Sequence, residues 1–392
     1  MNRGPAGALF AASTLFFAAL YTYVPALPAY VAGRTVSLTA VGVVLSMYGL
    51  WMAVFRMPLG VITDATGRTK PYLAGGVLVA GVGAVVMMLG HSAVPLALGR
   101  ALTGLSAAAW VPLMVVFAGY FPPEQAVFAT SLASFASSFG QMIGTSSTGF
   151  LEALGGDHLP FLSAAALALC AAAIIMFVHI PRRDPSHRGM VSTRSILSIF
   201  GRRDVLVPSF TNALCQFGVW AITFGFMPLL ARQEGASGVV VSLLLTVNVA
   251  GNVAANLFAT FAARRAGRKV LYGSFAMFSA GAIMAALTRS IPLLFASTIL
   301  MGLANGLFFP ILLGLSIQRV DPFHRSTAMG IHQAIYAVGM FTGPWIGGVL
   351  SDAVGIRTMF GIVAGFSLVL PSLLIRAWRA TGQTAPGQSR AP

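Results

Sequence analysis

Charged side chains are scarce in this chain of 392 residues, and acidic ones are the scarcest. Asp, Glu, Lys and Arg together make up 8% of the residues, and only 9 side chains are acidic against 24 that are basic. An ordinary soluble domain contains about 25% charged residues. Hydrophobic residues account for 57% of the chain. This composition excludes an ordinary water-soluble domain and indicates a protein whose main solvent is lipid.

Cysteine and histidine are also few, and their positions exclude several kinds of site. The two cysteines, Cys170 and Cys215, fall inside apolar runs and predict no disulfide framework. The six histidines lack the spacing of metal ligands. A Walker-type phosphate loop is absent, so ATP is not expected to drive this protein. The sequence therefore predicts no enzyme, no cofactor and no metal site.

Apolar runs of about 20 residues can cross a bilayer as helices, and the chain contains twelve of them. The pattern predicts an all-α membrane protein with twelve transmembrane helices. The predicted spans are 7–32, 37–63, 71–90, 94–120, 125–151, 159–180, 205–231, 237–263, 269–288, 291–318, 325–351 and 356–378. The tail 381–392 is polar and rich in Pro and Gly, and we expect it to be disordered.

Basic residues are distributed unevenly between the two sides of the predicted spans. If the N-terminus lies inside, 18 of the 24 fall in internal segments and 4 in external ones, while Arg56 and Arg100 lie within spans. Such an excess marks the cytoplasmic side. We therefore expect an integral protein of a bacterial inner membrane with both termini in the cytoplasm. The net charge of +15 is then a topology signal, and no nucleic acid partner is needed.

The chain divides into two similar halves at its longest interior break, residues 181–204. Gly67 and Gly267, each followed by Arg, lie 200 positions apart. "GLSAAAWVP" and "GLANGLFFP" begin 198 positions apart, and "GQMIGTSSTG" and "GMFTGPWIGG" begin 199 apart. These offsets predict two pseudo-symmetric six-helix halves with a substrate site between them. The expected parts are an N-terminal bundle, a cytoplasmic linker, a C-terminal bundle and the tail, at 1–180, 181–204, 205–380 and 381–392.

Three short motifs resemble those of the major facilitator superfamily. "GVITDATGRTK" resembles the family's G-x-x-x-D-x-x-G-R-x-K loop between spans 2 and 3, and "RALTG" resembles its R-x-x-x-G motif on span 4. "GMFTGPWIGG" on span 11 resembles the G-x-x-x-G-P-x-x-G-G pattern that the family's drug exporters carry on span 5; span 5 here lacks the proline. The residues at these positions are Gly60, Asp64, Gly67, Arg68, Lys70, Arg100, Gly104, Gly140, Gly144, Gly149, Gly339, Gly343, Pro344, Gly347 and Gly348.

The resemblance covers the whole chain and implies a secondary active transporter of the drug and metabolite efflux branch. Such a protein moves a small amphipathic molecule across the membrane as its two halves rock about a central site. We expect it to act as a monomer. The open alternatives are an organic-anion facilitator or exchanger, a lipid transporter without proton coupling, and a receptor that senses a solute. A receptor would normally carry a signalling domain, and the break at 181–204 is too short for one.

The charged turn at the end of span 2 is a candidate latch between the halves. Asp64 lies near the start of the next helix, where the helix dipole and Arg68 stabilise a carboxylate. The related turn of the second half carries Arg264 and Arg268 but no carboxylate, so we expect a weaker clamp there. Alternatively, both turns only set the topology. The glycines of spans 4, 5 and 11 favour close helix packing, and we expect Pro344 to bend span 11, with gating a secondary role.

Arg56 and Arg100 are the two charged side chains expected inside the membrane, where such groups are costly and usually functional. In related proton-coupled exporters the arginine of span 4 works beside an embedded carboxylate, and this chain has none. The departure argues against proton antiport and leaves a coupling proton as an open question. Either an anionic substrate supplies the missing charge, or backbone carbonyls and water satisfy the arginines. His332, inside span 11, either shuttles a proton or makes structural hydrogen bonds.

Amide side chains recur on one face of span 8. Asn248, Asn252 and Asn256 lie four residues apart, and such a row is not expected to face lipid. They either line the substrate cavity or hydrogen-bond to a neighbouring helix. The other candidates for the cavity are polar or aromatic side chains on spans 1, 4, 5, 7, 10 and 11: Tyr21, Trp110, Gln141, Asn212, Gln216, Trp220, Asn305 and Tyr336.

Overall fold

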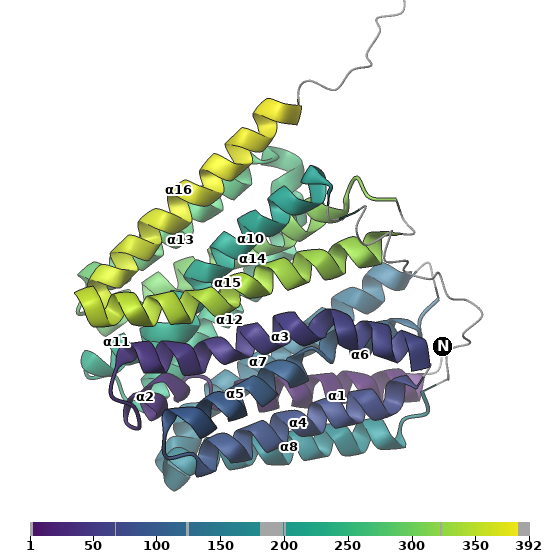
Figure 1. Cartoon of the computed structure of the whole chain (residues 1–392), viewed down its shortest axis with the longest axis horizontal. Coiled ribbons are helices and arrows are strands. Elements are labelled where there is room, and N and C mark those ends of the chain that lie inside the picture. The colour runs from purple at the N-terminus through teal and green to yellow at the C-terminus, as the bar shows by residue number, and fades with distance from the viewer. Residues whose placement is uncertain are drawn as a thin grey trace, which may run out of the picture.

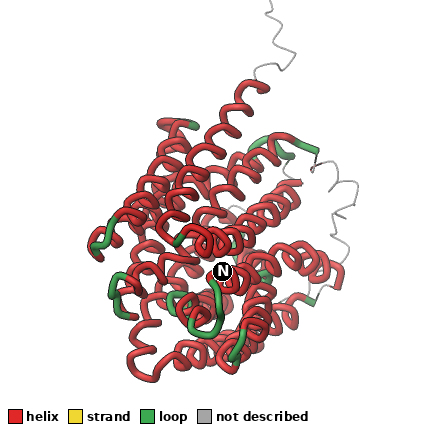
Figure 2. Tube along the Cα trace, turned by 60° about the vertical axis from the view of Figure 1, so that its left-hand side comes forward, coloured by secondary structure: helices red, strands yellow, loops and turns green. Residues whose placement is uncertain are grey.

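The computed structural model describes residues 3–66, 68–122, 125–180, 199, 201–321 and 324–382. Every regular element in this part of the chain is a helix, as Figure 2 shows. The first half contains α1 (Arg3–Tyr21), α2 (Leu27–Ala32), α3 (Leu38–Thr66), α4 (Thr69–Leu89), α5 (Ala93–Ala107), α6 (Trp110–Ala118), α7 (Ala126–Gly155), the short 3₁₀-helix η2 (Gly156–His158) and α8 (Leu159–Phe177).

The second half contains a matching series of helices. They are α10 (Arg203–Ala221), the π-helix η4 (Ile222–Phe226), α11 (Met227–Gln233), α12 (Gly238–Ala266), α13 (Lys269–Leu287), α14 (Ile291–Ile317), α15 (Arg325–Val354) and α16 (Ile356–Gly382). In Figure 1 this half lies above the first one, and α15 and α3 run side by side where the two meet.

The number of predicted membrane spans is confirmed in the described part of the chain. It contains 11 helical stretches that are long and apolar enough to cross a membrane. The longest of these stretches, 128–177, contains two helices, α7 and α8, with only the short η2 between them. Counting α7 and α8 separately gives twelve spans. Helices satisfy their own backbone hydrogen bonds, which lipid cannot do. Large apolar side chains such as Phe177 and Leu257 accordingly lie exposed on the outer surface.

The first span of each half leaves the regular α-helix at the same point of the repeat. In the first half α1 ends at Tyr21 and α2 begins at Leu27. In the second half η4 interrupts the span between α10 and α11. Pro28 and Pro228 lie in the first turn of the helix that follows, where a residue without a backbone N–H is tolerated.

Glycines bring α7 against α1 and α15 against α10 in the same way. A Cβ on Gly140 would collide with the carbonyl oxygen of Thr14, and one on Gly339 would collide with that of Ala213. Gly144 and Gly343 repeat the arrangement one turn later, against Ala18 and Phe217. Helices can approach this closely only where side chains are absent. The glycine pattern of spans 5 and 11 therefore serves the same packing in both halves.

The halves touch extensively through two helix pairs, α3 with α15 and α7 with α12. Both contacts include the end of the bundle at which residues 33–37, 155–158, 234–237 and 355 join the helices. We call it the contact end; it lies opposite the N-terminus in Figure 1. Gly42 faces the carbonyl oxygen of Pro344 there, and Gly149 faces the backbone of Gly238. Since α15 continues from Arg325 to Val354, Pro344 lies within an unbroken helix.

Candidate functional site

Arg100 lies buried in the middle of the first half with little to neutralise its charge. It is 2% exposed, and its guanidinium lies over the ring of Tyr48, with Cζ 4.4 Å from the ring centroid. A cation over an aromatic face is attracted to it. The Nε and Nη1 atoms of Arg100 are buried and have no well-aligned hydrogen-bond partner among the described residues, while the hydroxyl of Tyr23 lies close to Arg100 and Thr103. Buried polar atoms are nearly always hydrogen-bonded, so this group of orphaned atoms marks a candidate ligand site.

Arg56, on α3, reaches from the first half to the second. It is 6% exposed, and its Nη1 donates to the hydroxyl of Tyr336 on α15 over 3.2 Å. The same nitrogen lies 3.3 Å from the sulfur of Met52, while Nε is buried without a partner. Arg56 therefore makes a contact across the bundle, between α3 and α15.

Four tyrosines join the two arginines into one cluster. Arg100 lies over the ring of Tyr48 and close to Tyr21 and Tyr23. Arg56, on the same helix as Tyr48, bonds to Tyr336. We refer to Tyr21, Tyr23, Tyr48, Arg56, Arg100 and Tyr336 as the central cluster. Its residues lie on α1, on the turn after α1, and on α3, α5 and α15. The cluster therefore contains residues of both halves.

Aromatic rings continue the central cluster into the second half. Tyr48 stacks on Trp220 with ring centroids 5.3 Å apart and an angle of 15° between the planes. Trp220 packs on Phe224 at 5.0 Å, and Phe224 meets Tyr21 edge to face at 6.1 Å. The four rings therefore form a continuous series that crosses the boundary between the halves, and Arg100 lies over its first ring, Tyr48.

Carboxylates in the described part of the chain lie away from the cluster. Three of them have arginine partners near helix ends: Glu152 with Arg232 at 3.0 Å, Asp204 with Arg202 at 2.7 Å, and Glu234 with Arg357. Asp352 bonds to the start of α3. The central arginines thus have no acidic partner among the described side chains; those of Asp64, Glu124 and Asp184 lie outside that part.

His332 belongs to a second polar group, buried between α10 and α15. Its Nδ1 lies 3.0 Å from the hydroxyl of Ser209, and its Nε2 lies 2.9 Å from Nδ2 of Asn212. Ser209 already donates its one proton to the carbonyl oxygen of Val205 over 2.6 Å, so we assign the ring proton to Nδ1 and let Nε2 accept from Asn212. Oδ1 of Asn212 is left without a partner. This geometry fits a neutral, structural histidine.

The candidate amides of spans 7, 8 and 10 have different surroundings. Gln216 donates to Oδ1 of Asn305 over 3.2 Å, which ties α10 to α14. Asn248 is buried and donates to the carbonyl oxygen of Thr298 over 2.7 Å. Asn252 is half-buried and Asn256 is exposed, so the three amides of span 8 do not share one environment. For Asn248, the hydrogen bond to a neighbouring helix fits the second of our two expectations.

The remaining candidates lie outside the central cluster or beyond the described side chains. Trp110, at the start of α6, packs edge to face on Phe17 at 4.9 Å, and Gln141 is half-buried. A Cβ on Gly104 would collide with the carbonyl oxygen of Tyr48, so this glycine brings α5 against α3. Gly347 and Gly348 face, respectively, Phe226 and the start of α3.

The two charged turns contain both exposed and partly buried basic residues. Gly67 and the side chain of Asp64 lie outside the described residues, and Gly60 precedes them within α3. Arg68 is exposed and Lys70 half-buried. In the second turn Arg264 is exposed, whereas Arg268 packs over the ring of Trp378 at 4.0 Å, within its own half. The latch therefore stays a prediction.

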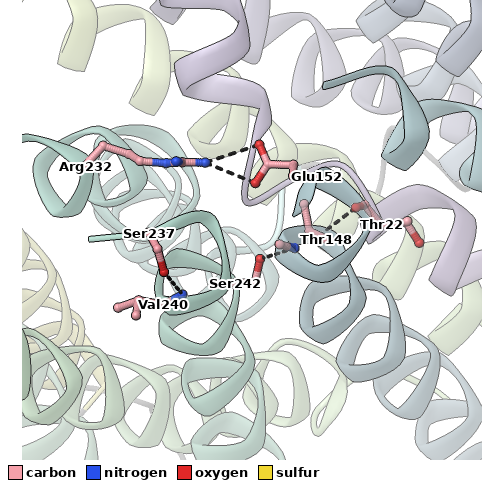
Figure 3. A network of polar contacts seen from close by, with 8 residues as sticks. Thr22, Thr148, Glu152, Arg232, Ser237, Val240 and Ser242 are labelled. Atoms are coloured by element: carbon pink, nitrogen blue, oxygen red, sulfur yellow. Dashed lines mark hydrogen bonds and ion pairs between the residues drawn. The ribbon is translucent and has the colours of Figure 1, made fainter. Parts of the chain in front are cut away.

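A polar network closes the contact end between α7 and the second half, as Figure 3 shows. Nη2 of Arg232 donates to both carboxylate oxygens of Glu152, at 3.2 and 3.0 Å. The backbone N–H of Gly149 donates to the hydroxyl of Ser242 over 2.7 Å, and Thr148 donates to the carbonyl oxygen of Thr22 over 2.7 Å.

Sequence reasoning missed Tyr23 and Tyr48, the partners of Arg100. Tyrosines in an apolar run carry no signal of their own, because the same residue type serves as core filling. The repeat offered one indication: Tyr48 lies 200 positions before Asn248, a residue that the amide pattern singled out. The carbonyl oxygen of Tyr48 faces Gly104 on α5, and that of Asn248 faces Gly302 on α14.

Comparisons with known proteins agree with the fold and the motifs. The sequence profile described as Major Facilitator Superfamily matches residues 9–238 and 209–391. The multidrug resistance protein MdtG of Proteus mirabilis (strain HI4320) is 25% identical over 351 residues, which are 82% of each chain. The inner membrane transport protein YajR of Escherichia coli (strain K12) is 34% identical over 113 residues, a stretch that spans only 28% of this chain and 25% of that protein.

Among solved structures, the nucleoside transporter NupG has the same fold. Its crystal structure superposes with a TM-score of 0.80 over 97% of this chain and 100% of that one, at 16% sequence identity. The profile match alone covers most of the chain. The protein belongs to the Major Facilitator Superfamily, and it is an integral membrane transporter of small molecules rather than an enzyme.

Proposed function

We propose that this protein is a secondary active transporter that exports a small amphipathic molecule from a bacterial cell. Its similarity to MdtG, a multidrug resistance protein, over 82% of both chains supports the direction and the breadth of substrates. The mixed chemistry of the central cluster supports an amphipathic substrate, because aromatic rings and polar hydroxyls lie side by side there.

One observation carries the mechanism: the central cluster is assembled from both halves. Arg56 bonds to Tyr336, and Tyr48 stacks on Trp220, each across the boundary. A rocking motion of one half against the other separates these pairs. Substrate that binds at the cluster is therefore exposed to one side of the membrane and then to the other, which is alternating access.

In this proposal the distribution of basic residues indicates which end of the bundle faces the cytoplasm and which faces outward. The N-terminus and the basic segments face the cytoplasm, so the contact end faces outward and the structure is closed on that side. The halves are residues 1–180 and 205–380, joined by the cytoplasmic linker 181–204 and followed by the tail. In the opposite state, the turn that contains Asp64 and Arg68 holds the cytoplasmic ends together, as its motif predicts.

Everted membrane vesicles test the proposed function. Vesicles from cells that express the chain should accumulate at least one compound from a panel of labelled amphipathic molecules of positive, neutral and negative charge. The double variant Tyr48→Ala, Trp220→Ala should reduce the initial rate about tenfold, because it removes the stack that joins the halves. Phe177→Ala, a change on the outer surface, is the matched control. Equal rates in the native and double-variant vesicles would contradict the proposal.

A further inference from the structure

The central cluster holds two positive charges that have no counter-charge among the described side chains. Arg100 and Arg56 are 2% and 6% exposed, respectively. A buried ion is costly unless an opposite charge and hydrogen bonds compensate for its lost water. The aromatic face of Tyr48 and the hydroxyl of Tyr336 provide part of this compensation. Neither supplies a negative charge.

Both arginines of the cluster have buried nitrogen atoms without a hydrogen-bond partner among the described residues. They are Nε and Nη1 of Arg100 and Nε of Arg56. Arg100 lies over one ring, Tyr48, which stacks on Trp220 of the second half, and Arg56 follows Tyr48 on α3. The chain thus presents donors for at least one acceptor group, and guanidinium donors bind carboxylates in preference to neutral acceptors.

The ring series beside these donors indicates the body of the ligand. Tyr48 and Trp220 lie nearly parallel with ring centroids 5.3 Å apart. The rings of Phe224 and Tyr21 continue the series. Planar aromatic groups stack favourably against such rings. The stack crosses the boundary between the halves, so a ring that enters it contacts both.

We propose that the transported molecule is an aromatic carboxylate, whose carboxylate binds Arg100, with Arg56 as the second positive charge of the cluster, and whose ring packs against Tyr48 and Trp220. The inference rests on the proposed function and narrows it to one class of substrate. The ligand then supplies the counter-charge that the described side chains do not provide. Because it contacts residues of both halves, its binding also favours the state in which they are close together.

Binding to the purified full-length chain in detergent tests the substrate class. The probes are benzoate and 2-naphthoate, each compared with its uncharged amide, and binding is measured by titration calorimetry. We expect at least one carboxylate to bind ten or more times as tightly as its amide, a difference of about 1.4 kcal/mol. Arg100→Gln should abolish the preference while the amide still binds. Arg289→Gln, an exposed arginine at the contact end, should leave it unchanged.

Arg56→Gln provides a second variant in case Arg100→Gln does not yield folded protein, and it should reduce the same preference. The inference is overturned if neither carboxylate binds better than its amide, or if the preference survives both substitutions. Vesicle transport separates the two proposals. Transport of neutral or cationic compounds without anion preference leaves the transporter intact and removes the substrate class. Carboxylate binding without any flux removes the transport proposal and keeps the anion site.

Discussion

The two contacts that join the halves, α3 with α15 and α7 with α12, occupy equivalent places in the repeat and are closed by different chemistry. In the first, Asp352 accepts from the backbone N–H groups of Leu38 and Thr39, at 2.9 and 2.7 Å, and from the Thr39 hydroxyl at 2.6 Å. In the second, Glu152 lies beside Gly238, the first residue of α12, and pairs with Arg232. Each carboxylate belongs to one half and meets the start of a helix in the other.

The acidic and serine residues of the two contacts occupy equivalent positions of the repeat, whereas the hydrogen bonds of the two carboxylates differ. Asp352 lies 200 positions after Glu152, and Ser237 lies 200 after Ser37. Both serines accept from a backbone N–H in the first turn of the helix that follows them. A carboxylate at a helix N-terminus is favoured by the helix dipole in either half. The repeated backbone therefore places a carboxylate near the start of a helix of the other half in both contacts. The groups that bind the two carboxylates differ.

The largest effect should come from the equivalent glycines inside the halves. Gly140→Ala and Gly339→Ala each place a methyl group against a backbone oxygen of the same half. Rocking cannot relieve this collision, so each variant should lose about 3 kcal/mol of stability. The melting temperatures of the two variants should fall by similar amounts. A fall in only one of them would show that the packing is not equivalent. Gly75→Ala, which meets nothing within 4 Å, is the control.

A smaller effect is expected for a glycine between the halves. Gly42→Ala collides with the carbonyl oxygen of Pro344, and the halves can avoid the collision by separating at the contact end. The variant should disfavour the closed state by about 2 kcal/mol, or about 30-fold in the ratio of closed to open molecules. Its melting temperature should change less than that of Gly339→Ala.

Spin labels at Val36 and Val354, both exposed near the contact end, report that opening. The labels are attached to cysteines introduced at these two positions, in a variant in which the native free cysteines Cys170 and Cys215 have been replaced. Electron paramagnetic resonance distances should show a longer population in Gly42→Ala and not in Gly339→Ala. Unchanged distances in Gly42→Ala would mean that the contact end does not open by separation of α3 from α15.

Asp352→Asn should open the contact end less than Gly42→Ala does. The amide retains one acceptor oxygen but loses the charge that interacts with the start of α3. The cost at this exposed site should be about 1 kcal/mol. The same spin labels measure the change. A variant as closed as the native chain would remove Asp352 from the set of residues that hold the halves together.

Glu152→Gln should have the smallest effect, and its size should depend on salt. The pair with Arg232 is partly exposed, and such pairs contribute about 0.5 kcal/mol. Screening at about 1 M salt should remove the difference between Glu152→Gln and the native chain. The effect of Asp352→Asn should persist better, because the loss there includes direct hydrogen bonds. Equal salt sensitivity of the two variants would erase the distinction between the contacts.

The sequence alone determined the twelve spans, the duplication and the absence of acid from the membrane interior. These follow from hydropathy over about 20 residues and from side chains that lipid excludes, and neither depends on how the helices pack. The spacing of Gly140 and Gly144, and of Gly339 and Gly343, likewise marked a packing face before any partner was known.

Only the tertiary structure decided what the polar residues do. It placed Arg100 on Tyr48, joined Arg56 to Tyr336, and separated the environments of Asn248 and Asn256. Helical periodicity shows that two residues share a face but does not show which helix, ring or carbonyl faces them. That choice depends on contacts between segments far apart in the chain, since the residues of the central cluster, with its two buried charges, come from four helices and both halves.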